Sequence, residues 1–298
     1  MNWQGVIPAI TTPFKPDLSV DAELLVKQVD ALVAAGCTGI VALGSLGEGG
    51  SLSFDEKKAV LRLSKEALAG RGSLVAGIAA ITTAEAARLA ELAREQGADA
   101  LMVLPPYVYK GDWRETRAHF EAVICETPLP CMLYNNPIAY GTDVLPGELV
   151  ELAGALPNLA AVKESSADVR RVSAIRALAG DRLAIFVGVD DLIMEGIAAG
   201  ATGWIAGLTD ALPAESVRLF ELARAGRVDE ARAIYDWFLP LLRLDTVPKF
   251  VQLIKLVQAE TGLGSETVRP PRLPLAGAER DAALKLIREA LAHRPRLA

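Results

Sequence analysis

A lysine and a tyrosine each stand at the end of a short apolar segment. Lys163 follows Ala-Ala-Val at residues 160–162, and Tyr134, 29 residues upstream, follows Cys-Met-Leu at residues 131–133. A primary amine held against apolar walls is less stable in its charged form, and a neutral amine attacks carbonyl carbons. We therefore expect Lys163 to form a Schiff base, although a lysine taken alone is ordinarily a solvated surface charge.

Tyr134 and a serine further upstream could move protons during such chemistry. A phenol beside a developing alkoxide or enamine can pass a proton in either direction, and the Ser45 hydroxyl would extend this relay. Ser45 lies in the turn Gly44-Ser45-Leu46-Gly47-Glu48, whose backbone N–H groups could hold a carboxylate or a phosphate. The alternative for Tyr134 is a core aromatic residue whose hydroxyl bonds to the backbone.

Two adjacent acids, Asp190 and Asp191, follow a later apolar segment. They could accept hydrogen bonds from substrate hydroxyls, or they could simply cap the N-terminus of a helix. The chain contains no G-x-G-x-x-G fingerprint and no P-loop, so we do not expect a nucleotide site.

Eight short apolar segments alternate with longer segments of helical periodicity, for which Ser19 and Thr83 are two expected N-caps. The eight are residues 5–10, 39–43, 74–79, 100–104, 131–134, 160–163, 183–187 and 203–206. Their uniformly apolar character indicates parallel strands covered on both faces. This pattern favours a (β/α)8 TIM barrel, whose active site lies at the C-terminal ends of the strands, over an open doubly wound sheet.

The chain after residue 212 is expected to form further helices at residues 215–224, 228–244, 249–260 and 278–292. We therefore predict a barrel over residues 1–212 and a C-terminal helical extension over residues 213–298. The extension is expected to pack beside the barrel or against another subunit.

The composition excludes several classes of protein. A net charge of −6 and a pI near 5.2 give no basic surface for nucleic acid or an anionic membrane. The sequence has no apolar stretch of roughly 18 residues and no targeting segment, which predicts a cytoplasmic location. An odd number of cysteines without a C-x-x-C pair, together with two histidines far apart, predicts no metal site.

Three motifs in order resemble those of the dihydrodipicolinate synthase / N-acetylneuraminate lyase family. They are Gly-Ser-x-Gly-Glu at residues 44–48, Tyr-Asn-x-Pro at 134–137 and Val-Lys-Glu at 162–164. The resemblance implies a (β/α)8 barrel with C-terminal helices, a homotetramer built as a dimer of dimers, and a covalent Schiff base with a 2-oxo acid that needs no cofactor.

The same resemblance assigns roles to individual residues. Lys163 would be the Schiff-base residue, and Tyr134 and Ser45 would relay protons. The implied substrate-binding residues are Gly44, Leu46, Gly47, Ser165, Gly188, Asp190, Asp191 and Ile205.

The departures from the family pattern bear on the substrate. Where the synthases have two adjacent threonines, this chain has Ser45-Leu46, and their arginine for a second carboxylate corresponds to Ala139. The tyrosine that reaches a neighbouring subunit's relay corresponds to Val108. That relay is therefore absent, or it is rebuilt through Tyr109 or Tyr140.

Four segments, residues 1–3, 44–48, 134–141 and 263–266, resemble the branch that deaminates 1-pyrroline-4-hydroxy-2-carboxylate in hydroxyproline breakdown. One carboxylate, one hydroxyl and a ring imine suit a pocket without a second carboxylate clamp. We therefore expect a lyase that releases ammonia and 2-oxoglutarate semialdehyde. The alternatives are a 2-keto-3-deoxy sugar acid aldolase or dehydratase, a dihydrodipicolinate synthase, and a ligand-binding barrel without turnover.

Overall fold

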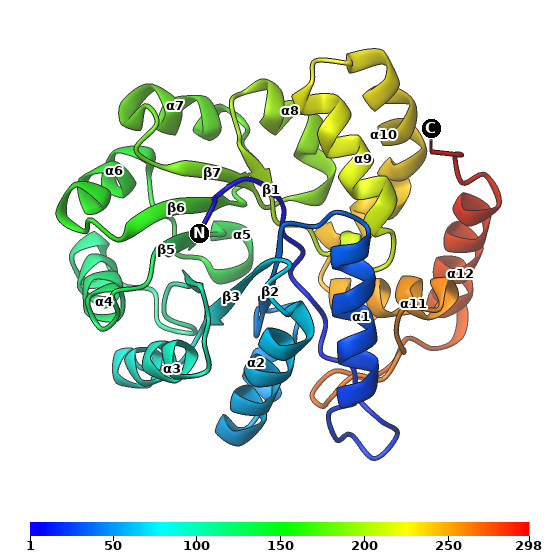
Figure 1. The fold of residues 1–298 in the computed structure, drawn as a ribbon, viewed down its shortest axis with the longest axis horizontal. Coiled ribbons are helices and arrows are strands. Elements are labelled where there is room, and N and C mark those ends of the chain that lie inside the picture. Colours follow the sequence, from blue (N-terminus) through cyan, green and yellow to red (C-terminus); the bar gives the residue numbers. More distant parts are fainter. Residues whose placement is uncertain (298) are drawn as a thin grey trace.

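Eight parallel strands alternate with helices in the computed structural model, which describes residues 1–297 (Figure 1). The strands are β1 (Gly5–Val6), β2 (Gly39–Ala42), β3 (Ser73–Ile78), β4 (Ala100–Val103), β5 (Cys131–Asn135), β6 (Leu159–Glu164), β7 (Ala184–Val187) and β8 (Gly203–Trp204). Each lies within one of the expected apolar segments or within a residue or two of it. The predicted fold class, a (β/α)8 barrel, is confirmed.

The sheet closes on itself. Its strand order is β1-β8-β7-β6-β5-β4-β3-β2, and the chain just after β1 then pairs with β2 through a bridge between Ala9 and Val41. The amide of Ile10 donates to the Val41 carbonyl at 2.9 Å, and the amide of Val41 donates to the Pro8 carbonyl at 2.7 Å. The alternative of an open doubly wound sheet is therefore wrong.

Both faces of the strands are covered by apolar side chains. One cluster fills the barrel interior, and a second, larger cluster lies between the strands and the surrounding helices. The interior cluster includes Ile7, Val41, Val75, Met102, Met132 and Phe186. This double burial explains why the strand segments are apolar throughout instead of alternating.

Eight helices surround the barrel, and the first four begin after a residue whose side chain caps a free backbone amide. They are α1 (Ala22–Ala34), α2 (Phe54–Leu68), α3 (Thr83–Glu95), α4 (Trp113–Cys125), α6 (Pro146–Ala155), α7 (Arg170–Ala179), α8 (Ile193–Ala198) and α9 (Pro213–Arg224). The N-cap of α1 is Asp21, not Ser19 as predicted, because the Ser19 hydroxyl donates to Asp17 at 2.6 Å. Likewise Thr82 caps α3, while the Thr83 hydroxyl contacts His119.

The C-terminal extension lies on one side of the barrel, outside α1 and α9 (Figure 1). It comprises α10 (Val228–Leu242), the short helix η4 (Arg243–Thr246), α11 (Phe250–Thr261) and α12 (Gly277–Ala292). Because α9 follows β8 and contacts β1 and α8, it completes the ring of barrel helices. The division of the chain into two units at residue 212 stays a prediction. No helix within residues 1–297 is long and apolar enough to span a bilayer.

The close approach of β2 and β3 gives a test of the barrel packing. A Cβ atom at Gly39 would lie 2.5 Å from the Ser73 carbonyl oxygen, so Gly39→Ala should destabilise the fold by about 1–3 kcal/mol. In the matched control Gly154→Ala, the new methyl group meets no atom within 4 Å, and the exposed helix α6 should gain stability. Thermal unfolding would check both; equal midpoints for the two variants would contradict this packing.

Candidate active site

Lys163 and Tyr134 lie side by side on neighbouring strands. They are register partners in the parallel pair β5 and β6, so both side chains leave the sheet at the same height. Lys163 is 6% exposed, and its Nζ lies 4.2 Å from the centre of the Tyr134 ring. Within residues 1–297, Lys163 takes part in no ion pair. The predicted pairing of amine and phenol is therefore present in the fold.

Three tyrosines and a serine form one cluster beside this lysine. The ring centres of Tyr134 and Tyr140 are 5.6 Å apart, and those of Tyr107 and Tyr140 are 5.5 Å apart. The Ser45 hydroxyl makes a short hydrogen bond with the Tyr140 hydroxyl and lies 3.4 Å from that of Tyr107. Asn136 donates to the Tyr134 hydroxyl at 3.1 Å. The hydroxyl groups of Tyr140, Ser45 and Tyr107 are thus linked.

The sequence left open whether Tyr109 or Tyr140 replaces the second phenol. Tyr109 is exposed, and its hydroxyl contacts the Glu115 carboxylate at 3.0 Å, away from the cluster. Burial raises the pKa of Tyr140 well above its usual value, and the phenols of Tyr134 and Tyr107 add to this shift. Tyr140 therefore stays a protonated donor at neutral pH. It is Tyr140 that occupies the place beside Ser45.

The turn that contains Ser45 is held in a tight conformation. Leu43 and Glu48 have positive φ angles of 64° and 52°. A Cβ atom at Gly47 would lie 2.8 Å from the Ile10 carbonyl oxygen, so a side chain there would displace the backbone. The Thr12 hydroxyl also donates to the Gly47 carbonyl at 2.7 Å. Glycine is therefore required at position 47 for the turn to pack against the chain that follows β1.

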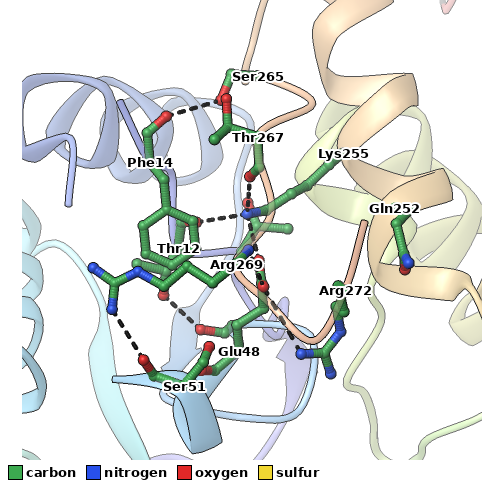
Figure 2. Close-up of polar contacts among 12 residues, drawn as sticks. Thr12, Phe14, Glu48, Ser51, Gln252, Lys255, Ser265, Thr267, Arg269 and Arg272 are labelled. Carbon is green, nitrogen blue, oxygen red and sulfur yellow. Dashed lines mark hydrogen bonds and ion pairs between the residues drawn. The ribbon is translucent and has the colours of Figure 1, made fainter. Parts of the chain in front are cut away.

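A buried ion pair ties this turn to the C-terminal extension (Figure 2). Lys255 of α11 donates to Glu48 Oε1 at 2.6 Å, and the two side chains are 1% and 0% exposed. Lys255 also donates to the Thr12 and Thr267 carbonyls at 2.9 and 2.7 Å. The amide of Arg269 donates to Glu48 Oε2 at 3.0 Å. Every donor of the ammonium group is thus satisfied.

Sequence reasoning missed both Lys255 and Tyr107. No local sequence pattern predicts the pairing of Lys255 with Glu48, because the two residues are 207 positions apart. Burial lowers the pKa of Lys255, and the Glu48 carboxylate opposes this effect. Tyr107 could have been found from its position directly before Val108. Val108 itself is 89% exposed and has a φ of 73°.

The predicted binding residues after β6 and β7 are close to Lys163. A Cβ atom at Gly188 would lie 2.7 Å from Lys163 Cε and 2.0 Å from the Ser165 hydroxyl oxygen, so only glycine leaves room for both side chains. The Ser165 hydroxyl is buried and has no hydrogen-bond partner in the described part of the chain. Ile205 lies buried just beyond β8. An unpaired hydroxyl beside the amine is available to a ligand.

Asp190 does not cap the short helix that begins with it; its carboxylate bonds instead to backbone amides just past β8. It is fully buried, and its two oxygens accept hydrogen bonds from the amides of Gly207 and Leu208 at 3.2 and 2.9 Å. Burial raises its pKa to about 7, while the Leu208 amide and Lys163 act in the opposite direction. Asp191 pairs with Arg243 at 3.4 Å. Contact of either acid with a substrate hydroxyl stays a prediction.

A model of the dihydrodipicolinate synthetase family matches residues 2–290. The chain belongs to this family. The 4-hydroxy-tetrahydrodipicolinate synthase of Xanthomonas axonopodis pv. citri is 36% identical over 299 residues, which cover 98% of this chain and 96% of the relative. The enzyme of the same name from Persephonella marina is 34% identical over 241 residues, 81% of this chain and 82% of the relative.

Solved structures of dihydrodipicolinate synthases share the fold over nearly the whole chain. The Aquifex aeolicus enzyme is 30% identical, with a TM-score of 0.91 and 97% of each chain covered. The chloride-inhibited enzyme of Acinetobacter baumannii, solved in complex with pyruvate, is 29% identical, with a TM-score of 0.92 and coverage of 97% of this chain and 99% of that one. Membership of the dihydrodipicolinate synthetase family therefore rests on sequence and fold alike.

We predict that Tyr140→Phe slows proton transfer. Removing the hydroxyl breaks the link to Ser45, so exchange of the pyruvate methyl protons with deuterated water should fall by about 10²–10⁴-fold. Proton NMR measures this exchange. Tyr109→Phe is the matched control and should keep the wild-type rate. Equal rates for both variants would show that Tyr140 has no part in the relay.

The Glu48–Lys255 pair gives a second prediction. Lys255→Met leaves a buried carboxylate without its cation, which should cost about 3–5 kcal/mol of stability, and adding Glu48→Gln should restore part of the loss. Urea unfolding of the two single variants and the double variant would measure the coupling. Lys249→Met breaks an exposed pair with Glu279 and should change stability little. A Lys255→Met variant no less stable than this control would refute the prediction.

Proposed function

We propose that this protein is a lysine Schiff-base lyase that deaminates 1-pyrroline-4-hydroxy-2-carboxylate. The observation that carries the proposal is the position of Lys163 Nζ, buried 4.2 Å from the Tyr134 ring and free of ion pairs within residues 1–297. A buried amine of this kind suits nucleophilic attack on an imine or a carbonyl.

The turn at residues 44–48 and the hydroxyl of Ser165 support the binding of one carboxylate and one 2-oxo or imino carbon. The turn offers backbone amides beside Ser45, and the linked hydroxyls of Ser45 and Tyr140 lead from it to the tyrosine cluster. A carboxylate on the turn would bring the adjacent carbon towards Lys163. Because both groups come from strand ends, the protein needs little motion to align them.

The absence of an arginine after Tyr134 supports a substrate with a single carboxylate. Ala139 occupies that place, within the short helix α5 (Pro137–Tyr140). The competing function is that of the named relatives, 4-hydroxy-tetrahydrodipicolinate synthesis. One feature favours it: the ammonium group of Lys110 lies against Gly141, just past this helix, and could hold a second carboxylate. Substrate assays therefore have to include the synthase reaction.

The proposed reaction begins with attack of Lys163 Nζ on C2 of the ring imine. The C2–N bond of the ring then breaks as its nitrogen takes a proton, which leaves an iminium on Lys163 and a primary amine on C5. A proton leaves C3 for the Tyr134 relay, and the resulting enamine expels the C4 hydroxyl, which departs as water after taking a proton.

Proton shifts then convert the C5 amine into an imine. Two hydrolyses follow: one releases ammonia from C5, and the other releases 2-oxoglutarate semialdehyde from Lys163. One water is lost and two are consumed, so the net reaction consumes one water. The iminium itself is the electron sink, and the proposed chemistry uses no metal or organic cofactor.

We also propose that the protein is a homotetramer built as a dimer of dimers. Large apolar side chains are exposed on the loops that follow three neighbouring strands: Ile81 after β3, Val108 after β4 and Ile138 after β5 are 67%, 89% and 73% exposed. Exposed apolar side chains gathered near one end of a barrel are typical of a subunit interface.

We predict that the purified protein releases ammonia from 1-pyrroline-4-hydroxy-2-carboxylate. Borohydride reduction in the presence of this substrate should leave a covalent adduct on the peptide that contains Lys163. Lys163→Ala should abolish both results, because no other group replaces the amine. Lys15→Ala, a change at an exposed lysine, should alter neither. A colorimetric ammonia assay and peptide mass analysis provide the measurements.

Other outcomes would identify the rivals. Consumption of pyruvate and aspartate semialdehyde without ammonia release would indicate the synthase. Dehydration or cleavage of 2-keto-3-deoxy sugar acids would indicate the sugar-acid enzyme. Ligand binding without any adduct on Lys163 would indicate a non-catalytic barrel and would end the Schiff-base proposal.

A further inference from the structure

One carboxyl group of the C-terminal extension lies at the mouth of the barrel. Asp245 belongs to η4, which contacts the short helix η2 (Asp190–Leu192) after β7. A Cβ atom built on Gly207, just past β8, would lie 2.5 Å from Asp245 Oδ1 and 3.0 Å from Leu46 Cδ2. The Asp245 carboxyl and the Leu46 side chain of the turn after β2 therefore both lie beside the end of β8.

This carboxyl has no structural task in the described part of the chain. Within residues 1–297, neither of its oxygens has a hydrogen-bond or ion-pair partner, and the residue is half-buried. Arg243, two residues earlier, pairs with Asp191 instead. A half-buried carboxyl without a protein partner is free to contact a ligand.

The surroundings of Asp245 favour its protonated form. Burial raises its pKa well above the usual range, and the neighbouring carboxyls of Asp190, Asp210 and Asp191 add to the effect, while Lys163 opposes it. A carboxylic acid that stays neutral near pH 7 can donate a proton or a hydrogen bond. Gly188, just past β7, lies against Lys163, and Gly207, just past the neighbouring strand β8, lies against Asp245, so the amine and the carboxyl are at adjacent strand ends.

We propose that Asp245 contacts the hydroxyl group at C4 of the substrate and donates the proton with which that hydroxyl leaves. This inference rests on the proposed function, because it assigns a residue to the step in which the enamine expels the hydroxyl. As the C4–O bond breaks, its electron pair goes to oxygen, the Asp245 proton completes a water molecule, and Asp245 becomes a carboxylate. Solvent returns a proton before the next turnover.

Asp245 also explains how a pocket without the arginine of the synthases could select a hydroxylated substrate. A simple 2-oxo acid such as pyruvate has no hydroxyl at this distance from the imine carbon. Formation of its Schiff base and exchange of its methyl protons would use Lys163 and the tyrosine cluster but not Asp245. The two reactions therefore separate the proposed acid from the rest of the site.

The test compares Asp245→Asn with the wild-type protein in both reactions. Ammonia release from 1-pyrroline-4-hydroxy-2-carboxylate should fall by at least about 100-fold in kcat, because the amide cannot supply the proton. Pyruvate exchange and the borohydride adduct on Lys163 should stay within about twofold of the wild type. Asp236→Asn, at an exposed acid of α10, is the matched control and should change neither reaction.

The dependence on pH gives a second readout. The wild-type rate of ammonia release should fall as the pH rises through the pKa of Asp245, because only the acid form donates. Asp245→Asn should lack this loss of rate at high pH. Because Asp190, Asp191, Asp210 and Lys163 are unchanged in the variant, their titration would then not account for the loss in the wild type.

Three results would overturn the inference. They are ammonia release by Asp245→Asn within threefold of the wild type, an unchanged fall of the rate at alkaline pH, and an equal loss of pyruvate exchange, which would indicate a structural role.

Failure of the wild-type protein to release ammonia would refute the proposed function instead. The same variant would then be assayed for dehydration of a 2-keto-3-deoxy sugar acid, which also carries a C4 hydroxyl. No dehydration of that acid by the wild type, or an undiminished rate in the variant, would also overturn the role of Asp245.

Discussion

A buried ammonium group must find acceptors that replace water, and this chain contains two buried lysines that differ in this respect. Lys255 donates to a carboxylate and to two carbonyls, which accounts for all three of its donors. Lys163 is also buried, but its ammonium group lies over the face of Tyr134 and has no ion pair in residues 1–297. The first lysine is bound into the structure, whereas the second is available for chemistry.

These two lysines are connected through the glycine turn after β2. Glu48 ends the turn and accepts from Lys255 and from the Arg269 amide, so the extension fixes the backbone on which Ser45 is presented. Ser45 in turn contacts Tyr140, next to Tyr134 and Lys163. The helices after the barrel thus fix the turn that presents Ser45. Asp245, from the same extension, lies beside Gly207 at the end of β8.

The family fold is preserved over nearly the whole chain. TM-scores of 0.91 and 0.92 to two dihydrodipicolinate synthases accompany sequence identities of 30% and 29%. The departures from the synthases that the resemblance implies, at Leu46, Val108 and Ala139, are in the loop segments that follow strands, where Ala139 belongs to the short helix α5. Because such loops carry little of the barrel's stability, they can change without altering the strand register. The fold alone therefore does not identify the substrate, which depends on the side chains at the barrel mouth.

Much of this site followed from the sequence, because the barrel is encoded locally. Strands that are apolar on both faces are recognised in the sequence as short continuous runs of apolar residues. Parallel strands bring the residues that follow them to one end of the sheet. That reasoning predicted Lys163, Tyr134 and Ser45 together, although it misplaced two helix caps by one or two residues. It also placed the turn at residues 44–48 directly after the second strand.

Only the tertiary structure decided the rest. It placed Tyr140, and not Tyr109, beside Ser45. It also showed that Asp190 bonds to backbone amides after β8, that Glu48 pairs with Lys255, and that Asp245 lies beside Gly207. The periodicity of the chain carries no information about these contacts, because they join residues far apart in sequence or depend on the direction in which a loop turns. Local patterns determine which segments become strands and helices, whereas the meeting of distant side chains depends on how those elements pack.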